Sequence, residues 1–395
     1  MAGSVPGPWL RAIAVAAAAG CALAVVSGAL GLDAAHRILA AVALPPLAAA
    51  AVTAWVAYRS LLPFALLAFV GFLAAALVTS PTAHLVLAAG SFAATIAFLV
   101  GCLGSRASVR ASWRDYVTLT KPRVMSLLLL TGAAGMFVGA GGVPEPARLA
   151  AMVAGLALAC GGASALNHLL DADVDRRMRR TGSRPVADER LAPAQALEFG
   201  LALSAFSFVL LASLVNVLAA FLALAGNLFY VFVYTRWLKR TTPQNIVIGG
   251  AAGALPPLVG FAAASGRLTP LALVLFLIVF LWTPPHFWAL ALLLKRDYQA
   301  ARIPMLPVVR GEAETARQIL AYTVLLVGAS LAPFAWRSVG LAYVAAALVL
   351  GGIFLALAWR LRAETSPRRA AALFHYSLLY LALLFVALAV DTVLL

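Results

Sequence analysis

The stretch Asn167-His-Leu-Leu-Asp171-Ala-Asp173-Val-Asp175-Arg-Arg-Met-Arg-Arg180-Thr-Gly-Ser-Arg184-Pro185 is the part of the sequence around which the chain is organised. It follows an apolar run over 149–166, which is long enough to be the end of a membrane helix. If that helix continues, the asparagine and the first and third aspartates are spaced by four residues and share one face. Asp173 would then point elsewhere. The stretch therefore predicts a row of polar side chains at the edge of a membrane.

The chemistry of this row indicates a cation and a phosphate ligand. Successive groups would lie ~6 Å apart along the helix, from a rise of ~1.5 Å per residue, and carboxylates in such a row repel one another unless a cation lies between them. Mg²⁺ prefers hard oxygen ligands, usually one or two carboxylates completed by water and phosphate. The arginines just downstream suit phosphate oxygens, which a guanidinium binds through two parallel hydrogen bonds. We therefore expect a Mg²⁺-dependent site for a lipid diphosphate.

The composition excludes a soluble domain. Of 395 residues, 64% are hydrophobic and 11% are charged, and the mean hydropathy is +0.99. This balance predicts an all-α polytopic membrane protein. The net charge of +15 comes from arginines in the short loops between apolar runs, which sets membrane orientation and does not predict a nucleic-acid partner. Three cysteines, Cys21, Cys102 and Cys160, lie in or beside apolar runs and offer no disulfide framework.

Apolar runs of about 20 residues predict roughly thirteen membrane spans. Four precede a basic connector, at 9–30, 36–58, 61–79 and 84–104. Nine follow it, at 124–142, 149–170, 193–214, 217–235, 246–264, 269–292, 318–335, 339–359 and 372–394. The predicted domains are a four-helix piece over 1–105 and a nine-helix piece over 115–395. A cytosolic N-terminus places every strongly charged loop on the cytosolic side of the membrane.

Two further polar clusters lie in the nine-helix piece, at 234–245 and at 295–307. Basic loops at the cytosolic ends of helices are expected from topology alone, so single arginines there carry little information. Asp297 is more informative, because an acid at a membrane boundary contributes little to topology and usually has a polar partner.

Several segments together resemble the UbiA superfamily of intramembrane prenyltransferases. The superfamily pattern is Asn-x-x-x-Asp-x-x-x-Asp, followed by Met-x-Arg-Thr-x-x-Arg-Pro. Within it, the chain is similar to the protohaem IX farnesyltransferases (haem O synthases) over about 115–395. The segments that carry this similarity are Leu119-Thr-Lys-Pro-Arg123-Val, Tyr234-Thr-x-x-Leu-Lys-Arg-x-Thr-Pro-x-Asn-Ile-Val-Ile-Gly-Gly250, Trp282-Thr-Pro-Pro-His-Phe-Trp288 and Asp297-Tyr-x-x-x-x-Ile-Pro-Met-Leu-Pro307. In this order and spacing the motifs are highly specific.

The resemblance implies a nine-helix bundle around a cavity that opens to lipid and is capped by cytosolic loops. The implied Mg²⁺ ligands are Asn167, Asp171, Asp175 and Asp297. The implied catalytic residues are these four together with Lys239 and His286. The implied substrate-binding residues are Lys121, Arg123, Arg180, Arg184, Tyr234, Arg240, Trp282 and Tyr298. One departure concerns the second metal: superfamily members commonly have an aspartate four residues after the position of Asp297, and this chain has Ala301 there.

The implied reaction joins farnesyl diphosphate to protohaem IX. Diphosphate leaves as an allylic cation forms, a haem vinyl group attacks that cation, and water completes a hydroxyethylfarnesyl substituent. No general base for this water is evident. His286, beside Pro284-Pro285, is the candidate for a haem-contacting or catalytic role, and we expect the two prolines to break their helix and free backbone carbonyls. The simpler alternative is a histidine that is hydrogen-bonded to one of those carbonyls.

The four-helix piece has two histidines, His36 and His84, at the starts of parallel spans, and they are candidate axial haem ligands. Asp33 could orient one ring. The alternative is interfacial histidines without a ligand. The local patterns resemble one half of haem A synthase, with Asp33 where that family usually has glutamate. The resemblance therefore implies a haem-binding or vestigial half, with haem A synthase or oxidase assembly factors as candidate partners.

Two other functions are weighed against haem O synthesis. One is a UbiA-type prenyltransferase that acts on a quinone precursor or another aromatic acceptor, which the segments 282–288 and 303–306 disfavour. The other is a transporter, which also has polar groups beside broken helices but holds its site near the membrane midplane. Under each alternative we expect a multi-pass protein of a bacterial inner membrane, with its active-site loops in the cytosol.

Overall fold

The computed structural model describes residues 8–29, 33–57, 62–77, 111–335 and 339–395, with short stretches between 87 and 98. All regular elements in these residues are helices. Nine helices of the described part are long and apolar enough to cross a membrane, as predicted for the nine-helix piece. They are α6 (Pro122–Ala140), α7 (Pro146–Leu170), α9 (Pro193–Leu214), the span Val217–Thr241, α12 (Asn245–Ser265), α13 (Pro270–Leu293), α16 (Gly311–Ala335), α17 (Leu341–Ala363) and α18 (Pro367–Leu394).

Glycine allows α6 and α12 to pack closely against each other. A Cβ atom on Gly135 or Gly139 of α6 would collide with backbone atoms of α12, and one on Gly260 of α12 would collide with the carbonyl group of Gly132. Apolar surface gives little driving force between helices in lipid, so close backbone approach through small residues is what holds such a pair together.

The span Val217–Thr241 changes its winding toward its C-terminal end. It begins as α10 (Val217–Leu228), continues as the π-helix η1 (Phe229–Leu238) and ends as α11 (Lys239–Thr241). π-Helical segments are rare and are frequently found at functional sites. No pattern in the sequence indicated this change.

α13 runs unbroken through Pro284 and Pro285, so the expected break in this helix is wrong. Both prolines are buried inside the bundle. Packing of neighbouring helices around a membrane helix compensates for the hydrogen bonds that proline removes.

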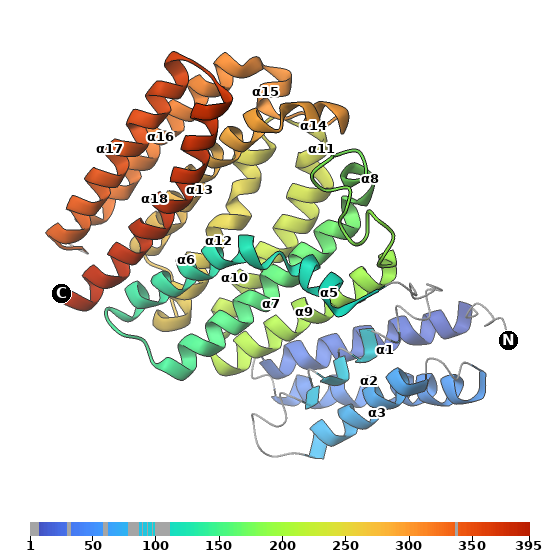
Figure 1. Cartoon of the computed structure of the whole chain (residues 1–395). Helices are drawn as coiled ribbons and strands as arrows, with labels where there is room; N and C mark the ends of the chain where they lie inside the picture. Colours follow the sequence, from blue (N-terminus) through green and yellow to red (C-terminus); the bar gives the residue numbers. More distant parts are fainter. Residues whose placement is uncertain are drawn as a thin grey trace.

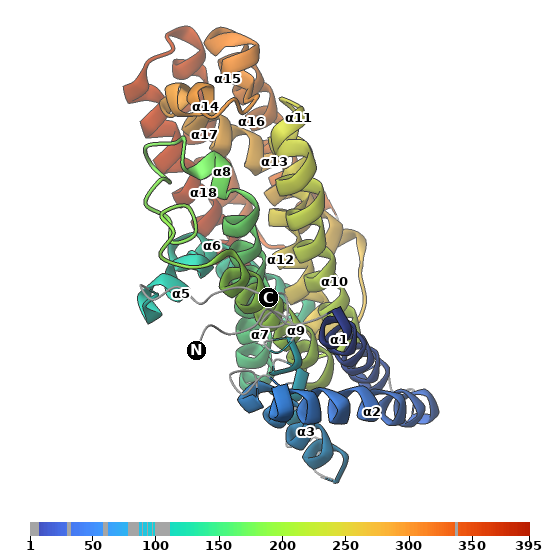
Figure 2. The ribbon, with the colours of Figure 1, turned by 90° about the vertical axis from the view of Figure 1, so that its right-hand side faces the viewer.

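Short helices gather at one end of the bundle, where Figures 1 and 2 show α8 (Ala172–Asp175), α11, α14 (Lys295–Ala300) and α15 (Leu306–Val309) together. They belong to the segments that carry the polar clusters of the sequence. A further short helix, α5 (Trp113–Thr120), forms in the basic connector, where Ser112 and Asp115 make a reciprocal capping box.

The N-terminal piece contributes α1 (Pro8–Ala29), α2 (Asp33–Ala57) and α3 (Leu62–Leu77). α1 packs against α9, where Val25 lies on the cluster around Val209. Figures 1 and 2 show these helices running across the direction of the bundle, on the side away from α16–α18. Most of the fourth predicted span, 84–104, lies outside the described residues, so the predicted parallel course of the second and fourth spans stays a prediction.

Candidate functional site

The residues of the quoted stretch that are spaced by four keep a helical relation to one another, although α7 ends between them. α7 ends at Leu170, and Asp171 is both its C-cap and the residue before α8. The backbone N–H of Asp171 donates to the carbonyl of Asn167 at 2.9 Å, and that of Asp175 donates to the carbonyl of Asp171 at 2.7 Å. The predicted helical relation of Asn167, Asp171 and Asp175 is therefore confirmed.

Asp171 lies at the centre of the candidate site, and its side chain is fully buried. Its Oδ2 accepts from Lys239 Nζ at 2.5 Å and from Asn167 Nδ2 at 2.7 Å. Lys121 Nζ donates to Asn167 Oδ1 at 2.7 Å, and Thr235 Oγ1 accepts from Asn167 Nδ2 at 3.1 Å. Three segments that are distant in sequence, the start of α6, the end of α7 and the run from η1 into α11, thus meet at Asn167 and Asp171.

The other two aspartates of the stretch face in different directions. Asp175 is buried, and Arg184 Nη1 donates to both of its carboxylate oxygens at 2.9 and 2.8 Å. Asp173 is exposed and forms a bidentate pair with Arg240 at 2.9 and 2.7 Å. This pair lowers the pKa of Asp173 below its ordinary value. Arg240 also donates to the carbonyl of Leu170, so in this structure it links α11 to α8.

Positive charge exceeds negative charge around Asp171. Desolvation by the surrounding protein, together with the cations Arg184 and Lys239, lowers the pKa of Lys121 to about 7, whereas Asp171 and Asp175 act in the opposite direction. Three basic groups here share two carboxylates. Such a cluster favours an anionic ligand, because an added anion relieves repulsion among the basic groups.

The side chains at the end of α7 offer oxygen atoms of the kind that Mg²⁺ prefers as ligands. Asp171 Oδ1 is buried and has no hydrogen-bond partner among the described residues, which leaves one carboxylate oxygen available. Two carboxylates with an amide oxygen are enough for this ion when phosphate completes its shell. The predicted set of four ligands is not brought together: in the described part of the chain no three histidine, cysteine or acidic side chains approach closely enough to hold one metal ion. Asp297 is half-buried on α14.

Three tyrosines lie close to the charged cluster. Tyr230 and Tyr234 stack within η1 with ring centroids 5.4 Å apart. A Cβ atom on Gly249 of α12 would collide with the ring of Tyr234, so this glycine sets how closely α12 approaches η1. Tyr298 of α14 is buried, and desolvation raises its pKa, although Arg180 and Arg184 oppose this effect. Its phenol therefore remains a hydrogen-bond donor.

His286 belongs to an aromatic cluster between α13 and α18. Its ring stacks on Trp282 and on Phe374 with centroid distances of 4.4 and 4.8 Å. Its Nδ1 lies 2.7 Å from Ser377 Oγ, and Trp282 Nε1 donates to the carbonyl of Ser377 at 2.7 Å. The simpler alternative for this residue is thus wrong in its detail, because the partner of the ring is a hydroxyl on another helix and not a carbonyl of α13.

Two predicted residues, Arg123 and Arg180, are exposed, and Arg180 acts on the pKa of Tyr298 beside the cluster. Other residues of the site were missed. Thr235, Tyr230, Ser377 and His168 were not predicted. Tyr230 could have been found, because it precedes Tyr234 by one helical turn. His168 is buried, and neither of its ring nitrogens has a hydrogen-bond partner among the described residues. No pattern in the sequence indicates this environment.

The candidate haem ligands of the N-terminal piece are described only in part. His36 Nδ1 lies 2.8 Å from the carbonyl oxygen of Ala24. A backbone contact of this kind fixes the orientation of a metal-binding imidazole, but it also satisfies a histidine that binds nothing. His84 and the side chain of Asp33 lie outside the described residues.

Comparison with known proteins identifies relatives of most of the chain. The model of the UbiA prenyltransferase family matches residues 128–387. The protoheme IX farnesyltransferase of Symbiobacterium thermophilum is 51% identical over 280 residues, which are 70% of this chain and 94% of that protein. The protein of the same name from Roseiflexus sp. (strain RS-1) is 52% identical over 280 residues, which are 71% of this chain but 52% of that protein.

Solved structures share the fold at low sequence identity. A digeranylgeranylglyceryl phosphate synthase superposes with a TM-score of 0.61 and 18% identity over 71% of this chain and 99% of that one. A UbiA homolog from Archaeoglobus fulgidus, solved with GPP and Mg²⁺, superposes with a TM-score of 0.52 and 17% identity over 71% of this chain and 100% of that one.

Proposed function

This chain belongs to the UbiA prenyltransferase family, and we propose that it converts protohaem IX to haem O by transferring a farnesyl group from farnesyl diphosphate. The observation that carries this proposal is the buried cluster around Asp171, in a chain half identical to protoheme IX farnesyltransferases along almost the whole length of one of them. Relatives of that name disfavour a quinone precursor as the acceptor. A transporter would not need a net-positive cluster at one end of the bundle.

The cluster is suited to the departure of diphosphate. Lys239, Lys121 and Arg184 would bind the diphosphate oxygens and stabilise the charge that develops as the C–O bond breaks and its electron pair stays on the leaving oxygen. Asp171, Asp175 and Asn167 would hold Mg²⁺, which supplies further neutralisation of the diphosphate when bound. Tyr298 would donate to the same oxygens. Asp297 would supply a carboxylate to the metal on a second side of the site, opposite the end of α7.

The aromatic cluster is suited to the acceptor. The rings of Trp282, His286 and Phe374 form a largely buried apolar stack, and a haem is a large planar ligand that would pack against aromatic rings of this kind. A haem vinyl group would attack the allylic cation, forming a C–C bond and moving the positive charge to the carbon next to the macrocycle. Water would add at that carbon and release a proton. Ser377 would fix the ring of His286 through its hydroxyl.

The domains, the topology and the N-terminal piece complete the proposal. We assign prenyl transfer to residues 115–395, with the end of the bundle that bears α8, α11, α14 and α15 facing the cytosol of a bacterial cell. Residues 1–105 are proposed to bind haem through His36 and His84, in proximity to the next enzyme or assembly factor. About half of the Roseiflexus relative lies outside the matched region, so fusion of the prenyltransferase to another segment has a parallel.

Membranes containing the full chain, incubated with protohaem IX, farnesyl diphosphate and Mg²⁺, test the proposal when the extracted haems are separated by chromatography. We expect haem O with this mixture, none after chelation of divalent ions, and recovery when Mg²⁺ is restored. An aromatic quinone precursor supplied in place of haem should give no prenylated product. Prenylation of that precursor without haem O, or uptake of farnesyl diphosphate without turnover, would contradict the proposal.

A further inference from the structure

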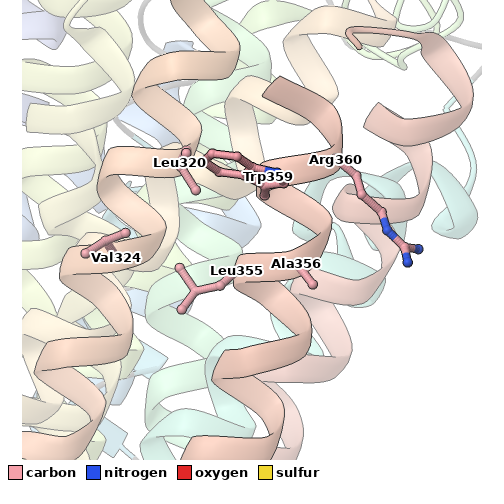
Figure 3. Close-up of a pocket in the computed structure, with 6 residues that line it drawn as sticks. All are labelled: Leu320, Val324, Leu355, Ala356, Trp359 and Arg360. Carbon is pink, nitrogen blue, oxygen red and sulfur yellow. The ribbon is translucent and has the colours of Figure 1, made fainter. Parts of the chain in front are cut away.

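Two adjoining hollows lie beside the cytosolic end of α17, away from the site described above. The first is a groove of about 480 Å³ between α16 and α17. Its walls are apolar except at Arg360, and Figure 3 shows Val324 and Leu355 on facing sides of it. The second hollow, of about 390 Å³, lies between α17 and α18 and is lined by Arg360, Arg368 and Arg369. Arg360 is common to both.

The arginines of the second hollow differ in how they are held. Arg369 Nη1 donates to the carbonyl of Arg360 at 2.6 Å, and Arg369 Nη2 pairs with Glu364 at 2.6 Å. This residue therefore joins the first turn of α18 to the last turn of α17. The side chains of Arg360 and Arg368 are exposed and have no hydrogen bond or ion pair within the described part of the chain. Figure 3 shows Arg360 reaching outward from α17.

The position of these two hollows indicates which class of ligand they would bind. They lie at the end of the bundle that carries the short helices and the basic loops, where a membrane protein meets the cytosolic leaflet. Trp359, which also lines the groove, is largely exposed, and tryptophan is enriched at the level of the lipid headgroups. An apolar groove that runs from this level along the helices matches an acyl chain. Two unpaired guanidinium groups at its head match a phosphate.

We propose that the α16–α17 groove and the arginine hollow together bind one phospholipid with a net negative headgroup, with an acyl chain in the groove and the phosphate at Arg360 and Arg368. Basic pockets between helices on the cytosolic side recognise anionic headgroups in this way. The complementarity of charge favours an anionic lipid over a zwitterionic one, whose own cation would meet the arginines. The site is independent of the prenyl-transfer cluster.

Native mass spectrometry of the delipidated full chain, titrated with phosphatidylglycerol or phosphatidylcholine, tests the proposal. We expect one bound phosphatidylglycerol with an affinity at least ~10-fold above that of phosphatidylcholine. The double variant Arg360→Gln/Arg368→Gln should bind phosphatidylglycerol about 30-fold more weakly, since each arginine at an anionic headgroup contributes roughly fivefold.

Two matched variants distinguish binding at this specific site from general attraction of the lipid to positive charge. Arg362 is exposed on the same turn but lines neither hollow, so Arg362→Gln should change the affinity by less than about threefold. Ala356→Phe fills the groove and leaves the arginines in place, and it should weaken binding at least ~5-fold. Glycerol phosphate, which has the headgroup charge but no acyl chain, should not displace the lipid at equal concentration.

The proposal is overturned by any of four results. The first is equal affinity for the two lipids. The second is a loss in Arg362→Gln as large as in the double variant, which would indicate attraction to the whole basic loop. The third is displacement of the lipid by glycerol phosphate, and the fourth is unchanged binding in Ala356→Phe. Either of these last two would leave the groove without a role.

Discussion

Single residues of the site are held by charge pairing. Lys239 and Arg184 neutralise Asp171 and Asp175, both of which are almost completely buried. Removing one member of a buried pair leaves an uncompensated charge and typically costs ~3–5 kcal/mol. Substitutions at these positions therefore affect stability as well as turnover, and the informative variants are those that keep shape and hydrogen bonding.

Asp171→Asn should lower haem O formation about 100-fold or more, because it removes the charge that holds Mg²⁺ while it keeps the volume and one acceptor oxygen. Chromatography of extracted haems measures this, with the amount of folded protein determined in parallel. Asp173→Asn is the matched control, since Asp173 is exposed and pairs with Arg240 outside the buried cluster. Equal losses in the two variants would remove Asp171 from its proposed role.

His286→Ala should weaken haem binding and slow haem O formation by about tenfold, because it removes the middle ring of the stack between Trp282 and Phe374. Haem titration followed by absorbance gives the affinity. His375→Ala is the control, since that ring is exposed and is bonded to the carbonyl of Ala371 in its own helix. Unchanged affinity and full activity in His286→Ala would leave the residue a purely structural one.

Among the elements, the π-helix η1 determines where Tyr230, Tyr234 and Thr235 lie. A π-helix has a wider turn than an α-helix, so its side chains take a different angular spacing. α12 can approach η1 because Gly249 has no side chain, and a few residues along α12 the neighbourhood of Gly253 is open. The two glycines therefore give a matched pair of substitutions in one helix.

Gly249→Ala should displace Tyr234, destabilise the protein by about 1–3 kcal/mol and reduce activity, because its methyl group overlaps the ring. Gly253→Ala meets no atom within 4 Å and should be neutral or stabilising by up to ~1 kcal/mol. Thermal unfolding in detergent and the haem O assay measure both effects. A stable, fully active Gly249→Ala protein would show that η1 tolerates displacement.

The elements also mark how far the sequence could predict the structure. Apolar runs predicted all nine spans of the bundle, because hydropathy alone decides which segments enter a membrane. The helical spacing of Asn167, Asp171 and Asp175 was predictable for the same local reason. The π-helix, the intact α13 and the contact of His286 with Ser377 were not, since each depends on packing between segments that are distant in sequence.

At the scale of the whole molecule, its two pieces can be compared for their need in prenyl transfer. The Symbiobacterium relative matches this chain over 94% of its own length, which leaves no room in it for a piece of about 100 residues like the one at the N-terminus here. Prenyl transfer should therefore need only the bundle.

A shortened chain that begins at Ser105 should still form haem O at a rate within about threefold of the full chain, since the two pieces meet mainly where α1 touches α9, away from Asp171. The same assay compares the two proteins, and the shortened chain carrying Asp171→Asn is the negative control. Loss of activity in the shortened chain, with the bundle still folded, would make the N-terminal piece part of the enzyme.

The two buried acids of the site, Asp171 and Asp175, each already have a basic partner. Before substrate arrives, Asp171 is bound to Lys239 and Asp175 to Arg184. A diphosphate that enters with its divalent ion brings one partner for the carboxylates and another for the bases, so the four side chains exchange partners without any of them being left unmatched. Substrate binding is then an exchange of ion pairs, in which the carboxylates pass from the basic side chains to the divalent ion and the basic side chains pass from the carboxylates to the diphosphate. Either component alone would leave half of the exchange incomplete, and each should therefore strengthen the binding of the other.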